Sequence, residues 1–125
     1  MASYGALLLR LILGVVYIMH AYLAVVVFGP SGMIAYQAKN GVPFPELATW
    51  YLILAHGLGG IFLVLGIYTR WAALVNVPAM LGALVFVHLK KGFWAFDGGY
   101  EYVLVLLVAT LAAAMIGGGA LSLRR

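Results

Sequence analysis

The stretch from Leu47 to Arg70, LATWYLILAHGLGGIFLVLGIYTR, constrains the fold of this chain more than any other. It is apolar and long enough to cross a bilayer, which takes about 20 helical residues. Near its middle, His56 is followed by Gly57, Gly59 and Gly60. Because Gly59 and Gly60 lie three and four residues after His56, the imidazole points to a face on which another helix can pack closely. The stretch therefore predicts a membrane helix whose ionisable group faces other helices and not lipid.

The overall composition places the chain in the membrane class. Hydrophobic residues make up 66% of its 125 residues and charged residues 8%, a balance unlike that of soluble domains of this size. We therefore expect one integral membrane domain covering residues 1–125. The sequence has no cysteine, which excludes disulfides, thiolate metal sites and dithiol chemistry within this chain. The net charge of +4 fits a few cations near lipid head groups and excludes nucleic acid as a partner.

Four apolar runs predict an all-α fold, a transmembrane four-helix bundle, because each run must satisfy its own backbone in lipid. Breaks of glycine, proline and charged residues separate the runs, at about residues 6–28, 48–67, 71–89 and 100–116. Residues 31–40 predict a short helix at the membrane surface. The two prolines of Val42–Glu46 predict an extended segment after it. Within the third run, Pro78 predicts a kink.

The distribution of basic residues predicts the orientation. Four spans put both termini on one face of the membrane. That face carries four arginines, Arg10, Arg70, Arg124 and Arg125, against three lysines, Lys39, Lys90 and Lys91, on the loop face. The positive-inside rule then places the N- and C-termini in the cytoplasm.

Three histidines gather toward the loop face of the predicted bundle. His20 and His56 each lie about eight residues from the loop-side end of their spans. Because these two helices run antiparallel, both imidazoles should lie at a similar depth, about 12 Å below the loop-side interface. His88 and Glu101 flank the last loop and should lie at that interface. The same depth count puts Arg10 and Asn76 in the opposite half, close together.

These polar residues allow more than one interpretation. His20 and His56 could be neutral rings that tie helices together by hydrogen bonds to a tyrosine, an asparagine or a carbonyl, with Tyr17, Tyr51 or a carbonyl at the kink as candidate partners. They could instead line a site for a quinone or lipid head group, with Tyr17 as a further contact. A haem or metal between the two rings is the third interpretation, and the sequence offers it no nearby carboxylate to orient the ligands. We treat Arg10, Asn76, His88 and Glu101 as structural polar residues.

Several short motifs resemble the DoxX family of small four-helix membrane proteins. They are Arg10–Gly14 with His20, His56–Gly60, Leu65–Arg70, His88–Phe93, Gly98–Glu101 and Gly117–Leu123. The resemblance covers nearly the whole chain and implies a four-helix bundle in the cytoplasmic membrane of a prokaryote. It also implies kinship with subunits of a thiosulfate:quinone oxidoreductase, the family's namesakes.

The chain departs from the family pattern at three places. His56 stands where the family usually has a glutamate, and Ala21–Val27 lacks the lysine usually found after His20. Ser122-Leu123-Arg124 replaces a terminal Ser-Leu-Asp pattern. These departures remove an acid and lysine pair and favour an accessory role over catalysis by this chain alone.

We therefore predict an accessory membrane subunit of a larger prokaryotic redox or energy-converting complex, without a redox centre or cofactor of its own. Its partners would be other membrane subunits and lipids. The alternative is a quinone-interacting subunit of an oxidoreductase, with His20 and His56 lining the head-group site. A small transporter or channel ranks last, because four helices with few polar residues make a continuous hydrophilic path unfavourable in a monomer.

Overall fold

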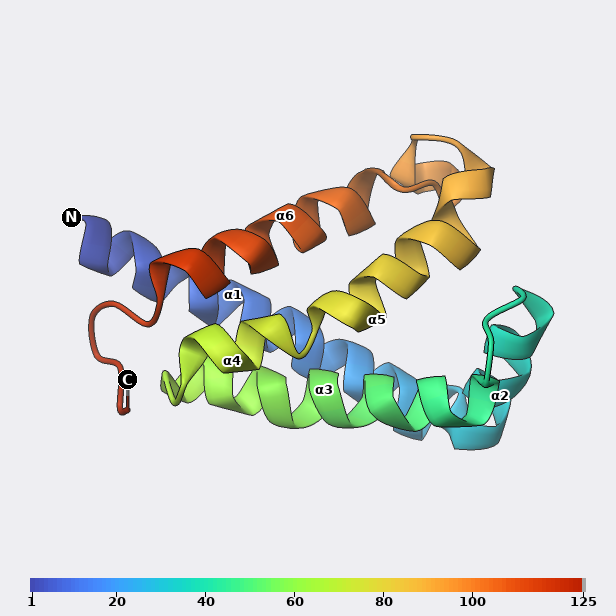
Figure 1. The fold of residues 1–125 in the computed structure, drawn as a ribbon, viewed down its shortest axis with the longest axis horizontal. Coiled ribbons are helices and arrows are strands. Elements are labelled where there is room, and N and C mark those ends of the chain that lie inside the picture. The colour runs from blue at the N-terminus through green and yellow to red at the C-terminus, as the bar shows by residue number, and fades with distance from the viewer. Residues whose placement is uncertain (125) are drawn as a thin grey trace.

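The structure, a computed structural model, describes residues 1–124 and is all-α (Figure 1). Arg125, one of the four arginines assigned to the terminal face, lies outside the described residues. The α-helices are α1 (Ala2–Tyr22), α2 (Gly29–Lys39), α3 (Pro45–Leu65), α4 (Thr69–Leu74), α5 (Val77–Gly82) and α6 (Glu101–Ile116). Two π-helical stretches, η1 (Leu23–Val27) and η2 (Ala83–His88), and two 3-10 turns, η3 (Leu89–Lys91) and η4 (Ala95–Asp97), complete the helical elements.

Three of the helical runs are long and apolar enough to cross a membrane. They are Ala2–Val27, Pro45–Leu65 and Thr69–Lys91, of 26, 21 and 23 residues. The fourth apolar helix, α6, is shorter, at 16 residues. The N and C ends lie at one end of the molecule, and α2 and the connection from η2 to α6 lie at the other (Figure 1). This arrangement is the one expected when the number of crossings is even.

The first helix shows how side chains divide between protein and lipid. Leu8, Ile12, Val15 and Met19 recur at helical spacing and are 49–68% exposed. On the opposite face Arg10, Leu13 and Tyr17 are at most 2% exposed (the same face carries the buried Ala6, Gly14 and Ala21). An outer face that is wholly apolar, with Arg10 and Tyr17 kept on the inner face, suits a helix whose outer neighbour is hydrocarbon.

Glycines set the distance between α1 and α3. A Cβ atom added to Gly60 would lie 2.9 Å from the carbonyl oxygen of Gly14, and one added to Gly14 would lie 2.7 Å from that of Gly60. Gly59 faces the other way, where an added Cβ would lie 2.6 Å from the Asn76 amide nitrogen. Lipid tails are as apolar as leucine, so close van der Waals contact of this kind is what holds membrane helices together.

The third long run is interrupted rather than smoothly bent. Its α-helical hydrogen bonding stops at Val75–Asn76, and Pro78 stands in the first turn of α5. The Tyr51 hydroxyl donates a 2.6 Å hydrogen bond to the carbonyl of Val75. A neighbouring helix thus satisfies a carbonyl at the break, as membrane helices with proline require.

The segment before α3 differs from the sequence prediction. Pro45 and Glu46, expected to be extended, form the first turn of α3, and Phe44 adopts a left-handed conformation with φ of 50°. Proline fits the first helical position because its missing N–H is not needed there. The Ala48 amide closes that first turn by donating to the carbonyl of Phe44.

Candidate functional site

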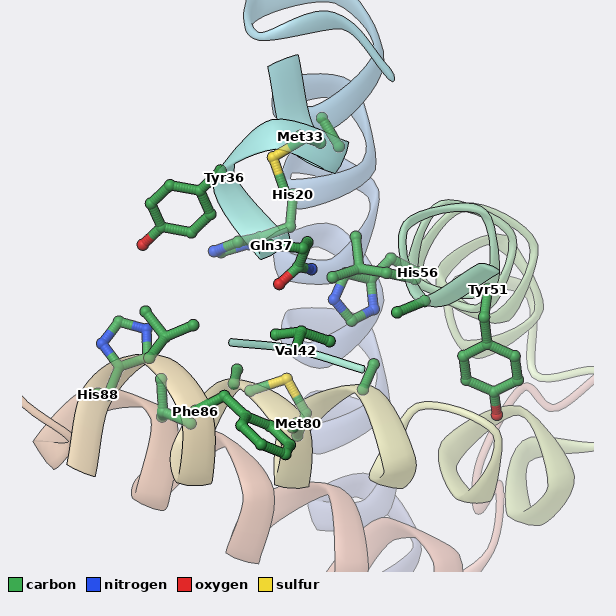
Figure 2. Close-up of a pocket in the computed structure, with 18 of the residues that line it drawn as sticks. His20, Met33, Tyr36, Gln37, Val42, Tyr51, His56, Met80, Phe86 and His88 are labelled. Atoms are coloured by element: carbon green, nitrogen blue, oxygen red, sulfur yellow. The ribbon is translucent and has the colours of Figure 1, made fainter. Parts of the chain in front are cut away.

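A large cavity opens between the helices at the loop end of the bundle. Its volume is about 1020 Å³, and its lining is mostly apolar. One wall comes from α1, η1, α2 and the first half of α3, and the other comes from α5, η2 and the beginning of α6. All three histidines of the chain line it, each from a different element (Figure 2). A cavity of this size with a few convergent polar groups is typical of a ligand site.

His56 is held by Asn76 in one defined orientation. The Asn76 Nδ2 donates to the carbonyl of Ala72 at 3.0 Å, which turns its Oδ1 toward the imidazole. The His56 Nδ1 lies 2.6 Å from that Oδ1. An amide oxygen can only accept, so His56 Nδ1 carries the proton and donates. In a neutral ring the other nitrogen, Nε2, is then an acceptor.

His20 and His88, like His56, carry their proton on Nδ1. The His20 Nδ1 donates to the carbonyl of Val16 at 2.8 Å. The His88 Nδ1 donates to the carbonyl of Gly98 at 2.7 Å. Backbone carbonyls cannot donate, so both rings use their Nδ1 proton in these bonds. Neither Nε2 atom bonds to another group of residues 1–124. The rings of His20 and His56 are 6.3 Å apart, edge to face, so two of the three lie close together.

The structure gives His56 an asparagine and His20 a carbonyl, two of the expected partner types, and corrects the two tyrosine candidates. Neither Tyr17 nor Tyr51 bonds to an imidazole: Tyr51 donates to Val75, and Tyr17 pairs with Thr110 at 2.5 Å. Thr110 already donates to the carbonyl of Leu106, so the Tyr17 hydroxyl is the donor in this pair. Tyr17 therefore presents its ring to the cavity, 4.7 Å from the ring of His56, and not its hydroxyl.

The expectation that Arg10 and Asn76 lie close together is wrong. Asn76 bonds to His56 and Ala72, as described above. Arg10 instead donates to four carbonyls, those of Leu63, Val64, Gly118 and Ala120, and is 1% exposed. The two residues thus have different roles. Asn76 orients a cavity histidine, and Arg10 connects the C-terminal segment to the C-terminal end of α3.

Glu101 takes part in the loop and not in the cavity. Its Oε1 accepts a 3.1 Å hydrogen bond from the amide of Ala95. His88 and Glu101 therefore do not pair, although each fixes a backbone group of the connection between η2 and α6. Both side chains bond to backbone groups of this connection, and His88 also lines the cavity.

Three further polar residues, for which the sequence predicted no role in a site, also line the cavity: Tyr36, Gln37 and Tyr102. Gln37 is 8% exposed, and its amide points into the cavity (Figure 2). The ring of Tyr102 stacks near His20, with centroids 6.3 Å apart. The π-helical stretches η1 and η2, which follow His20 and end at His88, had no signal in the sequence. Such turns are frequent at functional sites.

The chemistry available to this site is that of hydrogen-bond acceptors in an apolar chamber. Three imidazole nitrogens and the amide and hydroxyls of Gln37, Tyr36 and Tyr102 can meet a polar ring, and the apolar lining can hold its substituents. Among residues 1–124, no group of three or more His, Cys, Asp or Glu is arranged to hold a metal ion.

Comparison with known proteins gives two findings. A family model described as DoxX matches residues 5–89, a segment that contains all three histidines. A protein of Bacillus subtilis (strain 168) named "Putative oxidoreductase CatD" is 27% identical over 119 residues, which cover 95% of this chain and 84% of that protein. No solved structure matches the chain.

Proposed function

This chain belongs to the DoxX family of membrane proteins, and from that premise we propose that it is the quinone-binding membrane subunit of an oxidoreductase complex. It is a multi-pass membrane protein with at least one relative named as an oxidoreductase. In this proposal the cavity holds the ring of a membrane quinone. Catalysis and the resident redox centre belong to a partner subunit.

The cavity is the observation that carries the proposal. A membrane quinone has a compact polar ring and a long apolar tail, so its site needs a few polar groups in an apolar chamber. The histidines and Gln37 supply the polar groups, and Leu23, Phe86 and similar side chains supply the apolar walls. A cavity of about 1020 Å³ is large enough for a ring and the first part of a tail.

The loops support the part of the proposal that concerns a partner. Phe93, Trp94 and Phe96 are 42, 56 and 81% exposed at the loop end, and Trp94 stacks on Phe96. Exposed aromatics at a membrane interface can anchor in the head groups or meet another protein. Without a cysteine in the sequence, the chain itself has no dithiol to exchange electrons with the ring. We therefore expect the electrons to pass to or from an adjacent subunit.

We propose that the N- and C-termini face the cytoplasm. The support is the count of basic residues in the sequence, four arginines toward the terminal end (Arg10, Arg70, Arg124 and Arg125) against three lysines toward the loop end (Lys39, Lys90 and Lys91). The cavity would then open toward the outer half of the membrane.

The first experiment measures quinone carried by the protein itself. Gly82 lines the cavity, and a Cβ atom there would meet nothing within 4 Å, so Gly82→Phe can fill the cavity without a backbone clash. Gly5 also has open space around its Cβ position but does not line the cavity, so Gly5→Phe is the matched control. The protein is purified from native membranes into lipid nanodiscs, and quinones are extracted and quantified per chain. We expect Gly82→Phe to lose most of the quinone and Gly5→Phe to keep it; equal content in both would refute the site.

A second experiment tests whether the chain has a redox centre of its own. We expect the separated chain to give no visible absorption band, and the complex purified in mild detergent to give the spectrum of its partner. A reduced-minus-oxidised haem signature in the separated chain that disappears in His20→Ala or His56→Ala would overturn this assignment.

A further inference from the structure

We propose that the cavity prefers the reduced, hydroxyl-bearing form of its ligand, a hydroquinone, over the corresponding quinone. This inference rests on the proposed function, because it concerns the redox form that the same site selects. It follows from the hydrogen bonds of the three imidazoles, each of which uses its Nδ1 proton in a bond within the protein.

The His56 ring is fixed as an acceptor by a chain of two hydrogen bonds. Asn76 can offer only its oxygen to His56, because its Nδ2 is committed to the carbonyl of Ala72. Asn76 is 0% exposed, and a flipped amide would set its oxygen against the carbonyl oxygen of Ala72, where neither group can donate. A neutral His56 therefore presents a lone pair on Nε2 and no N–H to the cavity.

The other two rings reach the same state with backbone partners. The carbonyl of Val16 takes the Nδ1 proton of His20, and the carbonyl of Gly98 takes that of His88. If either proton moved to Nε2, two lone pairs would face each other across less than 3 Å. All three neutral histidines are thus acceptors toward the cavity.

A hydroquinone and a quinone differ in whether their oxygens can donate a hydrogen bond to such acceptors. The hydroxyls of a hydroquinone donate, and they can bond to an imidazole lone pair. The oxygens of a quinone only accept, so they find no partner in any of the three rings. Tyr36, Gln37 and Tyr102 can donate or accept and so bond to either form; they do not cancel the difference.

The three rings come from both walls of the cavity: His20 on α1 and His56 on α3 belong to one wall, and His88 on η2 belongs to the other (Figure 2). A ring with hydroxyls on opposite edges can therefore bond to more than one histidine. A hydrogen bond made in one form and lost in the other changes affinity by about tenfold. We expect a preference for the hydroquinone of at least about tenfold.

The test compares three probes built on the same ring, on the full chain in nanodiscs without oxygen. They are a short-chain hydroquinone, its quinone, and the dimethyl ether of the hydroquinone, which keeps the ring but cannot donate. Dissociation constants are measured by calorimetry. We expect the hydroquinone to bind at least about tenfold more tightly than both other probes.

Two variants check that the histidines produce the preference. In His20→Leu the hydroquinone should lose about tenfold in affinity, while the affinity for the quinone stays unchanged. In Tyr22→Phe, which lies two residues away but does not line the cavity, both affinities should be those of the original chain. If His20→Leu does not fold, the dimethyl ether comparison on the unmodified chain still decides the question.

The outcomes separate this inference from the function on which it rests. Binding of none of the three probes would refute the quinone site itself. Equal or tighter binding of the quinone would refute the selection and leave the site intact. A preference that survives in His20→Leu without change would remove His20 from the account and overturn the assignment of the acceptors.

Discussion

Asn76 is the residue on which the orientation of the site depends most. It is completely buried, and it connects the backbone of α4 to the imidazole of His56. Depth counting from the sequence brought His20 and His56 together correctly but placed Asn76 in the opposite half. The reason is that His56 and Asn76 lie almost equally far along the chain from the turn between α3 and α4, so they meet. A count from predicted span ends, each uncertain by a few residues, could not resolve this.

Replacing Asn76 by alanine should destabilise the chain and loosen the His56 ring. The substitution leaves the Nδ1–H of a buried histidine without a partner, which costs about 1–3 kcal/mol. Asn40→Ala is the matched control, because Asn40 makes one exposed hydrogen bond to the carbonyl of Tyr36. The free energy of unfolding is measured by denaturation in mixed micelles. Equal stability of the two variants would contradict the buried pair.

At the scale of elements, the glycines were predictable and the irregular turns were not. The positions of Gly59 and Gly60 relative to His56 indicated a packing face, and the structure confirms close approach at both glycines. The π-helical turns η1 and η2 have ordinary apolar sequences, so only the packing around the cavity distinguishes them from α-helix. Phe44 is a similar case, since proline statistics argue against the left-handed conformation that it adopts.

Gly60→Ala should weaken the contact between α1 and α3. The added methyl group would lie 2.9 Å from the carbonyl oxygen of Gly14 and 2.8 Å from the Ile18 side chain, so the helices must move apart. We expect a loss of about 1–3 kcal/mol in the free energy of unfolding. Gly57→Ala, whose methyl group would meet Ala21 at 3.7 Å, is the control and should be neutral or slightly stabilising. The same denaturation assay tests both, and a harmless Gly60→Ala would refute the tight crossing.

At the scale of the whole molecule, Arg10 joins the two ends of the chain. The last carbonyls of a helix lack the usual amide partners four residues on, and the negative end of the helix favours a cation there. Arg10 donates to Leu63 and Val64 at that end, and to Gly118 and Ala120 of the C-terminal segment. The segment then continues alongside Gly66, which bonds to Ser122 and Arg124. The sequence showed a charge inside the membrane but not its four acceptors, because the segment after α6 has no regular pattern.

Arg10→Lys should release the C-terminal segment. A lysine can replace only part of the forked set of bonds, so we expect a loss of about 2–4 kcal/mol. Limited proteolysis should cut the segment after α6 sooner than in the unmodified protein. Arg70→Lys is the control, because Arg70 makes exposed bonds to Met115 and Ile116 and its replacement should cost less than about 0.5 kcal/mol. Equal cleavage in both variants would contradict the role of Arg10.

The orientation of the molecule can be tested because the sequence has no cysteine. Single substitutions Ala2→Cys, Lys39→Cys and Lys90→Cys place a thiol at three exposed positions. In intact cells a membrane-impermeant maleimide should label the two loop positions and spare Ala2→Cys. Labelling of Ala2→Cys alone would reverse the orientation, and labelling of all three positions would contradict a membrane crossing by the first helical run, Ala2–Val27.

The central claim, that the cavity at the loop end binds a membrane quinone, is tested most directly by photo-crosslinking. An azido-quinone is activated in native membranes that contain the chain, and the modified peptides are identified by mass spectrometry. We expect adducts on the cavity walls, in residues 20–24, 33–37 and 83–88, to be suppressed by excess unlabelled quinone and by Gly82→Phe. Adducts confined to the lipid-facing side chains of α1, such as Leu8 and Ile12, and insensitive to competition would contradict the claim.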